Sequence, residues 1–226
     1  MDDIISEIRK ELNKHIDKAY RDGAKNFFKE KVNPIGVRLP IVRKIAGKYY
    51  KELKDSPKLN KIGNSLVKSH YFEEVVIGLQ LLEKTRDIKL FESFLDNYIH
   101  NWAHCDFLCT KHIALTLKEN PNLIKVLYSW AKSKNRWKVR ASSVSLVTLV
   151  NKGIFIDDAL KIAKINFSSK DDLVQKGNGW MLRQIFYHDK KLLYKFVMKN
   201  RKVMPRTTLR YAIEKFPENE RKILMS

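Results

Sequence analysis

Cysteine is nearly absent from this chain of 226 residues, which contains only Cys105 and Cys109. Two cysteines cannot build a disulfide framework, so small disulfide-stapled secreted proteins are excluded, and the four-residue spacing suits two buried thiols on one helical face. The longest weakly polar run, residues 141–150, contains three serines and a threonine and is far shorter than the ~20 residues of a membrane span. The N-terminus is acidic, unlike a secretory signal. We therefore expect a soluble, cytoplasmic protein with no membrane partner.

Acidic side chains are outnumbered as well. The chain has 25 Asp and Glu against 45 Lys and Arg, a formal net charge of +20 at pH 7. Such a charge repels itself unless a polyanion or counterions compensate it, so nucleic acid is the natural partner. Alternatively, a Lys-rich surface only keeps the protein soluble. The chain also has no glycine-rich phosphate loop and no Gly-x-Ser-x-Gly elbow, which argues against kinases, ATPases and esterases.

Glycine and proline, which interrupt helices, number only 8 and 6. Apolar residues recur at steps of three and four along nearly the whole chain, a period that favours helix over strand. We expect an N-terminal amphipathic stripe from Ile4 to Tyr20 that breaks at Asp22-Gly23, then a short segment at Phe27 and a turn at residues 33–36. The later helices are expected over residues 39–53, 57–68, 71–84, 88–99, 102–118, 121–133, 136–150, 156–165, 170–187, 190–200 and 205–215, before a short terminal helix.

Pairs of these helices follow one another without a linker, at roughly 35 to 45 residues per pair. This spacing is typical of HEAT-like repeats, whose helix pairs stack into a curved, right-handed superhelical solenoid. We therefore predict an all-α HEAT-like helical repeat solenoid, forming a single domain over residues 1–226. Because the sequence repeat is weak, a plain helical bundle remains the alternative.

Three pairs of a tryptophan and a charged residue stand at helical spacing: Trp102 with Asp106, Trp137 with Arg140, and Trp180 with Arg183. Each pair projects from one helical face. Arg140 follows Asp106 by 34 positions and Arg183 follows Arg140 by 43. Each separation is about one repeat, so the pairs can line one groove and Arg140 can meet Asp106. Singly, each pair is more simply a core tryptophan and an ordinary salt bridge. Three pairs in register on a basic chain favour a functional groove.

Gly177 and Gly179 lie within a helical pattern, where each glycine costs about 1 kcal/mol relative to alanine. Their missing side chains would let a DNA backbone come close to that helix. Close packing of a neighbouring helix explains them equally well.

A cluster of metal-ligand residue types occurs at His104, Cys105, Cys109 and His112. A structural zinc site normally draws its ligands from two elements, and the chain has no second Cys/His cluster. We therefore predict no metal and no cofactor. The sequence leaves open whether His104 and His112 do more than pack.

Four blocks of the sequence resemble the AlkD-type DNA alkylation-repair glycosylases, a family of HEAT-like repeat proteins. They are an aromatic-Lys, Gly and Pro-x-x-Arg stretch from Phe27 to Arg43, Trp-x-x-x-Asp at 102–106, Arg-Trp-x-x-Arg-Ala at 136–141, and Lys-x-x-Gly-Trp-x-x-Arg at 176–183. The blocks follow the family's order, and the likeness covers most of the chain. Gly177 and Asn178 stand where the family often has Ala-Ile type residues.

This resemblance implies a monofunctional DNA glycosylase that hydrolytically excises positively charged N3- or N7-alkylated purines from double-stranded DNA, without base flipping. The catalytic residues that it implies are Asp106, Trp102, Trp180 and Arg140. The residues expected to contact DNA are Arg183, Phe27, Arg38, Arg43, Trp137, Lys138 and Arg210. We further expect a monomer that associates with the nucleoid when it is bound to DNA.

The chemistry fits these residue types. An alkylated ring nitrogen makes the base a cationic leaving group, so no general acid is needed. The deoxyribose becomes oxocarbenium-like, and the Asp106 carboxylate can stabilise that charge and orient water. Trp102 and Trp180 can offer ring faces to the cationic centre, while Arg140 would keep Asp106 ionised and grip a phosphate. No lysine in the blocks is placed as a Schiff-base nucleophile, so lyase activity is not expected.

Two other functions remain open from the sequence. A non-catalytic HEAT-repeat module would bind unusual or damaged DNA structures, and its binding would survive mutation of Asp106. An RNA- or protein-binding solenoid would repeat basic and aromatic residues evenly along the array. Here the aromatic-charge pairs cluster in the central and C-terminal part of the chain.

Overall fold

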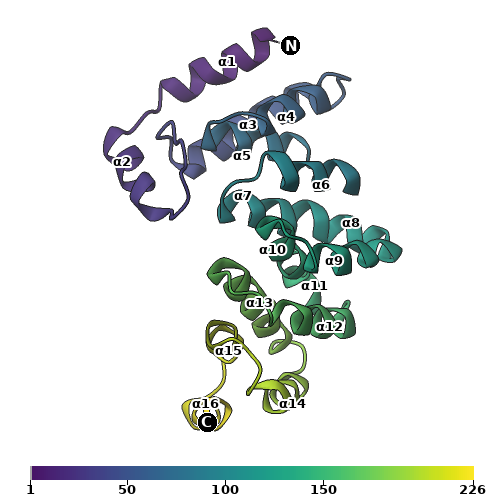
Figure 1. Ribbon diagram of the computed structural model, residues 1–226. Coiled ribbons are helices and arrows are strands. Elements are labelled where there is room, and N and C mark those ends of the chain that lie inside the picture. The colour runs from purple at the N-terminus through teal and green to yellow at the C-terminus, as the bar shows by residue number, and fades with distance from the viewer. Residues whose placement is uncertain (1) are drawn as a thin grey trace. The chain divides into compact units, whose positions relative to one another are not determined.

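The structure is a computed structural model that describes the backbone of residues 2–226 and the side chains of residues 3–24 and 26–226. Every regular element in this part of the chain is a helix, and it contains no strand (Figure 1). The all-α prediction is therefore confirmed. None of the helices over residues 2–226 is long and apolar enough to cross a membrane.

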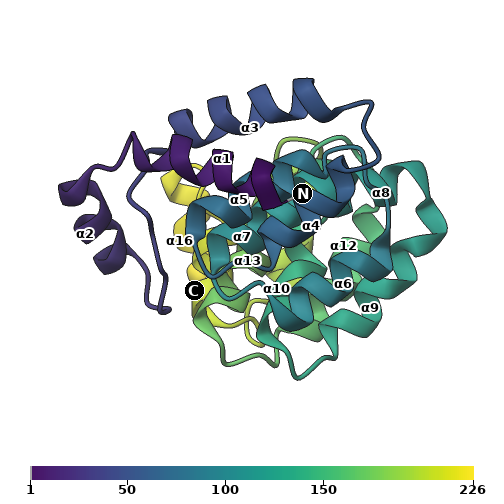
Figure 2. The same cartoon turned by 90° about the horizontal axis from the view of Figure 1, so that it is seen from above.

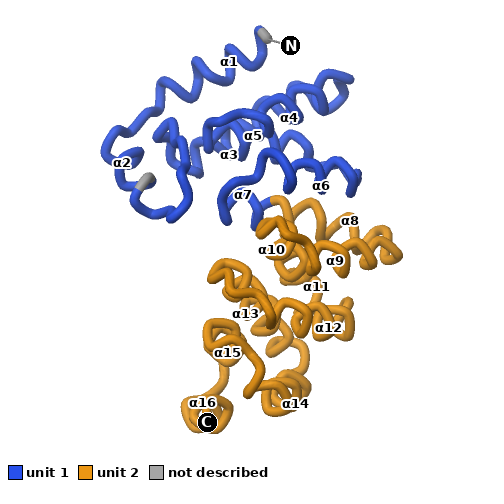
Figure 3. Tube along the Cα trace, in the orientation of Figure 1, with its two compact units in different colours: residues 1–107 blue, residues 108–226 orange. Residues whose placement is uncertain are grey.

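The chain divides into two compact units, residues 1–107 and 108–226 (Figure 3). The helices of the first unit are α1 (Asp2–Asn13), α2 (Lys18–Phe27), α3 (Leu39–Leu53), α4 (Leu59–Val67), α5 (Phe72–Leu81), α6 (Ile88–Asn97) and α7 (Trp102–Phe107). The second unit contains a π-helix (Leu108–Ile113), α8 (Ala114–Glu119), a 3-10 turn (Pro121–Leu123), α9 (Ile124–Ala131), α10 (Arg136–Val144), α11 (Val147–Val150), α12 (Ile156–Asn166), α13 (Asp172–Ile185), α14 (Lys190–Asn200), α15 (Arg206–Ala212) and α16 (Glu218–Met225).

Helix α5 is the centre of the first unit, where it packs against α3, α4 and α7. Its residues are buried almost without interruption, as expected for a helix covered on all sides. Helix α1 lies along α3, as both views show (Figures 1 and 2). The apolar stripe of α1, made by Ile5, Ile8 and Leu12, joins the core of this unit.

In the second unit the helices form two layers. Helix α13 packs between α10 and α15, and α9 packs against α12. The pairs α9–α10 and α12–α13 are each in contact and consecutive in the chain, which is the helix-pair organisation that the sequence spacing predicts. The layer of α10, α13 and α15 carries Trp137, Arg140, Trp180, Arg183 and Arg210.

The N-terminal stripe is two helices, and the break expected at Asp22-Gly23 is wrong. Helix α1 ends at Asn13, and α2 begins at Lys18 after Asp17, whose carboxylate accepts a hydrogen bond of 2.9 Å from the Tyr20 N–H. This cap starts the second helix early. Gly23 lies inside α2, because a helix tolerates a single glycine at a modest energetic cost.

The helix expected over residues 102–118 is present, but it is not uniform. Six residues, Leu108–Ile113, form a π-helix between α7 and α8. Most of the buried positions nevertheless keep steps of three and four through this segment, although His104 and Ala114 are buried as well: Cys105, Leu108, Cys109, His112, Ile113, Thr116 and Leu117. Hydrophobic spacing therefore cannot reveal the π-helix in advance.

The helix expected over residues 136–150 is interrupted after Val144, and α11 resumes at Val147. The serines before the break are buried, and the Ser142 hydroxyl donates a hydrogen bond of 2.7 Å to the Val139 carbonyl oxygen. Serine hydroxyls that bond to a preceding carbonyl compete with the helical ladder and bend helices. A prediction from the spacing of apolar residues ignores these serines and therefore misses the interruption of the helix.

Candidate functional site

Helix α7 begins at Trp102, directly after Asn101. The Asn101 side-chain oxygen accepts a hydrogen bond of 3.0 Å from the His104 N–H and so caps the helix. The half-buried Trp102 ring lies 5.5 Å from the Phe28 ring and 5.8 Å from the Phe27 ring, measured between centroids. The end of α2 thus brings two phenyl rings onto Trp102.

These aromatic rings line an apolar pocket of about 390 Å³ in the first unit. Phe27 is 70% exposed, so most of its ring is open to solvent. Tyr20, Leu39 and Phe72 contribute to the wall of the same pocket. Aromatic walls of this kind favour flat or cationic groups, through stacking and through attraction to the ring faces.

Asp106 lies one turn after Trp102 on the same helix. Both side chains are half-buried, whereas those of His104 and Cys105 between them are buried. Helix α7 therefore turns Trp102 and Asp106 toward its accessible side and packs its other side into the protein. The four-residue spacing of the two residues has this consequence in any regular helix.

His104 is a structural residue. Its ring stacks on Phe72 at 4.4 Å, its Nδ1 lies 2.9 Å from the Asn101 side-chain nitrogen, and its Nε2 lies 3.0 Å from the Phe72 carbonyl oxygen. Because a carbonyl only accepts, Nε2 carries the proton and Nδ1 accepts from Asn101. Burial lowers the pKa of His104 to about 4, despite the opposing hydrogen bond to Phe72. Both ring nitrogens therefore have hydrogen-bond partners within the protein.

Trp137 and Arg140 lie on α10 and are both buried, at 7% and 5% exposure. The Asn135 side chain caps α10 by accepting a hydrogen bond of 2.8 Å from the Trp137 N–H. The Arg140 guanidinium donates a hydrogen bond to the carbonyl oxygen of Leu173 on α13. In the second unit, therefore, Arg140 ties α10 to α13.

The two glycines of α13 make room for neighbouring helices. A Cβ on Gly177 would lie 3.1 Å from Nη1 of Arg140, and a Cβ on Gly179 would lie 2.5 Å from the Tyr211 Cβ and 2.7 Å from the Thr208 carbonyl oxygen. Both glycines are buried. Of the two explanations that the sequence offers, close helix packing is the one that this geometry supports.

Asn178 lies between these glycines and is fully buried. Its side-chain nitrogen donates a hydrogen bond of 3.0 Å to the Ala163 carbonyl oxygen, and its oxygen accepts one of 3.1 Å from the Ser143 hydroxyl. Asn178 thus connects α13 with α10 and α12, which explains a polar residue where the resembled family often has an apolar one.

Trp180 is half-buried on α13, and Arg183 follows it by nearly one turn. Arg183 forms an ion pair with Glu214. Burial raises the pKa of the Glu214 carboxyl, but the charge of Arg183 and hydrogen bonds from Lys215 and Arg183 outweigh it and hold the pKa below its usual range. The Arg183 side chain is 19% exposed, so it meets solvent only at part of its surface.

The remaining cations that the sequence singles out differ in exposure. Arg43 on α3 and Arg210 on α15 are exposed, and Lys138 on α10 is half-buried. Arg38 is exposed before α3, where its guanidinium lies 2.9 Å from the Asp17 carboxylate and 5.0 Å from the centre of the Tyr20 ring.

The structure brings some of the predicted site residues together. In the first unit, Phe27 contacts Trp102, and Asp106 lies on the same helix. In the second unit, Arg140 bonds to the helix that carries Trp180. Asp106 and Arg140 belong to different units, and their pairing stays a prediction.

Sequence reasoning missed Glu73, a buried carboxylate at the start of α5. Its oxygens accept hydrogen bonds from three consecutive backbone N–H groups, at 2.8 Å from Ile35, 2.9 Å from Gly36 and 3.0 Å from Val37. These bonds fix the loop between α2 and α3, which also lines the aromatic pocket. The sequence feature that could have indicated Glu73 is a pair of acidic residues in the first turn of an otherwise apolar helix.

Comparisons with known proteins agree with this fold. The sequence model of a family described as "DNA alkylation repair enzyme" matches residues 8–216. Among solved structures, the chain resembles one described as "Predicted DNA alkylation repair enzyme from Enterococcus faecalis", with a TM-score of 0.79, 13% sequence identity, and coverage of 90% of this chain and 98% of that chain. At this identity the likeness concerns the fold alone. No curated protein sequence matches the chain.

Proposed function

The chain belongs to the DNA alkylation repair enzyme family, and from this premise we propose that it is a DNA glycosylase. Its substrate is duplex DNA that contains a purine alkylated at N3 or N7, and its reaction is hydrolysis of the bond between that base and deoxyribose. The observation that carries the proposal is the placement of Trp102 and Asp106 on the accessible side of α7, next to the aromatic pocket.

The leaving group sets what the protein has to supply. A purine alkylated at N3 or N7 is cationic, so it accepts the electron pair of the breaking C1′–N bond and leaves as a neutral base. Positive charge then develops on the sugar, and a water molecule adds to C1′ and loses a proton. The protein must therefore stabilise a cation at the sugar rather than protonate the base.

Asp106 is the group proposed for this task. A carboxylate beside the sugar stabilises an oxocarbenium-like transition state and orients the attacking water, because it places negative charge where positive charge develops. The Trp102 ring can face the same cation, a contact worth roughly 0.5 to 2 kcal/mol depending on desolvation. Phe27 and Phe28 support the Trp102 ring from α2.

The second unit contributes Arg140 and Trp180 to the proposal. The resemblance of the sequence blocks is the ground for both roles: Trp180 as a second ring for the substrate, and Arg140 as the cation that keeps Asp106 ionised when DNA is bound. The hydrogen bond from Arg140 to the Leu173 carbonyl oxygen supports the role of Arg140, because it holds the guanidinium against α13, where the absent side chain of Gly177 leaves room for it. A positioned guanidinium loses less entropy when it meets a carboxylate or a phosphate than a free one.

The experiment that tests this function is base release from a defined lesion. Purified protein is incubated, in the presence of a chelator, with duplexes that contain one N7-methylguanine, one O6-methylguanine or no lesion. We expect free N7-methylguanine to appear and the other two duplexes to stay intact, because only N7 methylation creates a cationic leaving group. Binding of the N7-methylguanine duplex without any base release would overturn the glycosylase proposal and support a non-catalytic damage-binding module instead.

A further inference from the structure

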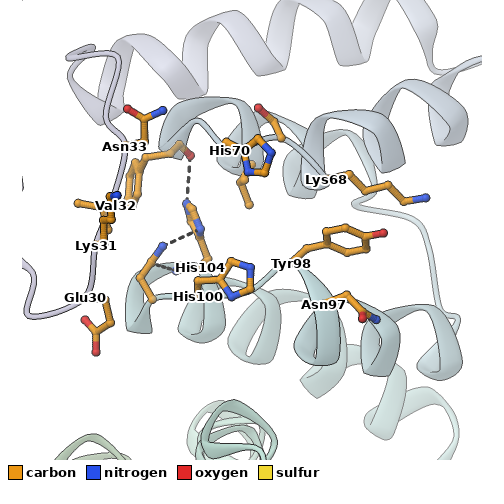
Figure 4. Close-up of a pocket in the computed structure, with 14 residues that line it drawn as sticks. Glu30, Lys31, Val32, Asn33, Lys68, His70, Asn97, Tyr98, His100 and His104 are labelled. Carbon is orange, nitrogen blue, oxygen red and sulfur yellow. Dashed lines mark hydrogen bonds between the residues drawn. The ribbon is translucent and has the colours of Figure 1, made fainter.

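A second pocket of the first unit has a volume of about 880 Å³, and most of the residues that line it are of polar or charged types (Figure 4). It opens between the loop before α5 and the loop before α7, with residues 30–33 along one side. Its buried wall is formed by Val75, Asn101 and His104, next to the half-buried Phe72. It adjoins the aromatic pocket, with which it shares Val32 and Phe72, but Trp102 lines only the aromatic pocket.

Basic side chains surround the mouth of this pocket. Four of them are exposed and come from three separate segments: Lys31, Lys68, His70 and His100. Figure 4 shows His70 and His100 on opposite sides of the opening. One carboxylate, that of Glu30, also lines the pocket. The balance of charge therefore favours an anionic ligand.

These four basic groups are not neutralised within the protein. Among the described side chains, those of residues 3–24 and 26–226, these four take part in no ion pair and no hydrogen bond. The Lys68 ammonium lies 5.7 Å from the centre of the Tyr98 ring. Three other cations of the same unit are paired with carboxylates at 2.8–2.9 Å: Arg9 with Glu74, Lys48 with Glu11, and Arg38 with Asp17. The pocket thus retains its capacity for an anion.

A ligand that fits this pocket must match its volume and its aromatic lining as well as its charge. A phosphate group alone needs only a surface with cations, whereas this pocket is several times larger than a phosphate. Tyr98 is half-buried and lines the pocket, as do Phe72 and His104, whose rings stack on each other. Basic side chains beside an accessible aromatic ring face are the combination that proteins use for unpaired nucleotides, because the phosphate meets the basic groups and the base stacks on the ring.

We propose that this pocket binds one nucleotide that has left the base stack of the DNA, with its phosphate at Lys68 and His100 and its base against Tyr98. The bound nucleotide is not the damaged one, because the proposed catalytic residue Trp102 faces the other pocket. The inference rests on the proposed function only in taking DNA as the partner. A displaced nucleotide of DNA and a free mononucleotide share this chemistry, and the DNA nucleotide is the ligand proposed here.

The test is a binding measurement on DNA without any lesion. Fluorescence anisotropy compares three duplexes: one fully paired, one with a single bulged thymidine, and one with a bulged abasic sugar-phosphate. We expect the bulged thymidine to bind about tenfold tighter than the paired duplex, the gain that corresponds to one stacked base, and the abasic bulge to lie between them. Equal affinity for paired and bulged duplexes would overturn the proposal, and equal affinity for the two bulges would overturn the base contact.

Two double variants locate the effect. Lys68→Ala with His100→Ala should abolish the preference for the bulged thymidine. Lys44→Ala with His15→Ala removes the same two residue types from exposed positions of the same unit that do not line the pocket, and should keep the preference. A preference retained by the first double variant would place the nucleotide elsewhere. Thermal unfolding followed by circular dichroism checks that both proteins are folded.

A competition arm separates the two sources of the ligand. Thymidine 5′-monophosphate, added at the nucleotide concentration of the bulged duplex, should displace none of it. Displacement at that concentration would identify the pocket as a mononucleotide site and overturn its assignment to DNA. Since no lesion is present, failure here leaves the glycosylase proposal intact, and failure of base release leaves this measurement unaffected.

Discussion

The Glu73 carboxylate accepts a hydrogen bond of 2.9 Å from the backbone N–H of Gly36, across the gap between the start of α5 and the loop that follows α2. Glu73 is only 1% exposed, and its neighbour Glu74 pairs with Arg9 of α1 at 2.8 Å. Two consecutive carboxylates therefore attach the N-terminal segments to the central helix of the first unit. The segment that they hold carries the phenyl rings that contact Trp102.

Glu73→Gln is expected to destabilise the protein by on the order of 2 kcal/mol, because a neutral amide of the same shape replaces a charged acceptor of buried N–H groups. Urea unfolding measures the change. Glu52→Gln, at an exposed position on α3, is the matched control and should stay within about 0.5 kcal/mol of the wild type. Equal effects of the two substitutions would refute the anchoring role of Glu73.

Because His104 is buried, the protein should lose stability in acid. Burial lowers its pKa to about 4 from an ordinary value of 6.5, so between these values the unfolded chain binds a proton that the folded chain does not. The free energy of unfolding should therefore fall as the pH drops from about 6.5 to 4, by on the order of 3 kcal/mol from this residue. Urea unfolding at several pH values would show a flatter profile for His104→Gln, and an unchanged one for His15→Gln, whose side chain is exposed.

Replacement of two helical glycines by alanine should change the free energy of unfolding in opposite directions. Gly179→Ala places a Cβ 2.5 Å from the Tyr211 Cβ and should destabilise the second unit by about 1 to 3 kcal/mol, the usual result of overpacking. Gly23→Ala meets nothing within 4 Å and should stabilise α2 by roughly 0.5 to 1 kcal/mol, since alanine is the better helix former. Denaturant midpoints measure both, and stabilisation by Gly179→Ala would contradict the packing of α13 on α15.

Arg183 should contribute to DNA affinity without sequence preference. Replacing it by alanine is expected to weaken duplex binding about equally for all sequences, and to reduce the slope of log affinity against log salt by about one, the value for one lost phosphate contact. Lys222→Ala on α16 removes another ion-paired cation of the same unit and is the control. An unchanged salt slope in Arg183→Ala would show that the residue serves only its ion pair with Glu214.

Much of the helical framework follows from local sequence information. The expected helices over residues 39–53 and 190–200 have the same limits as α3 and α14, and the spacing of Trp102 and Asp106 correctly places both on one side of a helix. These features depend only on the helical period, which a sequence displays directly. The π-helix at Leu108–Ile113 leaves that period intact and therefore stays hidden.

Features that depend on distant residues could not be predicted in the same way. Glu73 bonds to residues 36 to 38 positions earlier in the chain, and Lys31, Lys68 and His100 come from separate loops. No periodicity links such positions, since only the packing of the helices decides which loops meet. The resemblance to a family supplied the candidate site, and the structure explains its glycines and places its aromatic residues.

The most direct test of the central claim is the single-turnover rate of base release from an N7-methylguanine duplex by Asp106→Asn, measured with its affinity for the same duplex. Asp55→Asn, whose carboxylate is 89% exposed between α3 and α4, makes the same change of charge elsewhere in the first unit. We predict that Asp106→Asn binds the duplex within about threefold of the wild type and excises at least about 100-fold more slowly, while Asp55→Asn behaves as the wild type. Wild-type excision by Asp106→Asn would contradict the account, because the carboxylate would then have no part in the reaction.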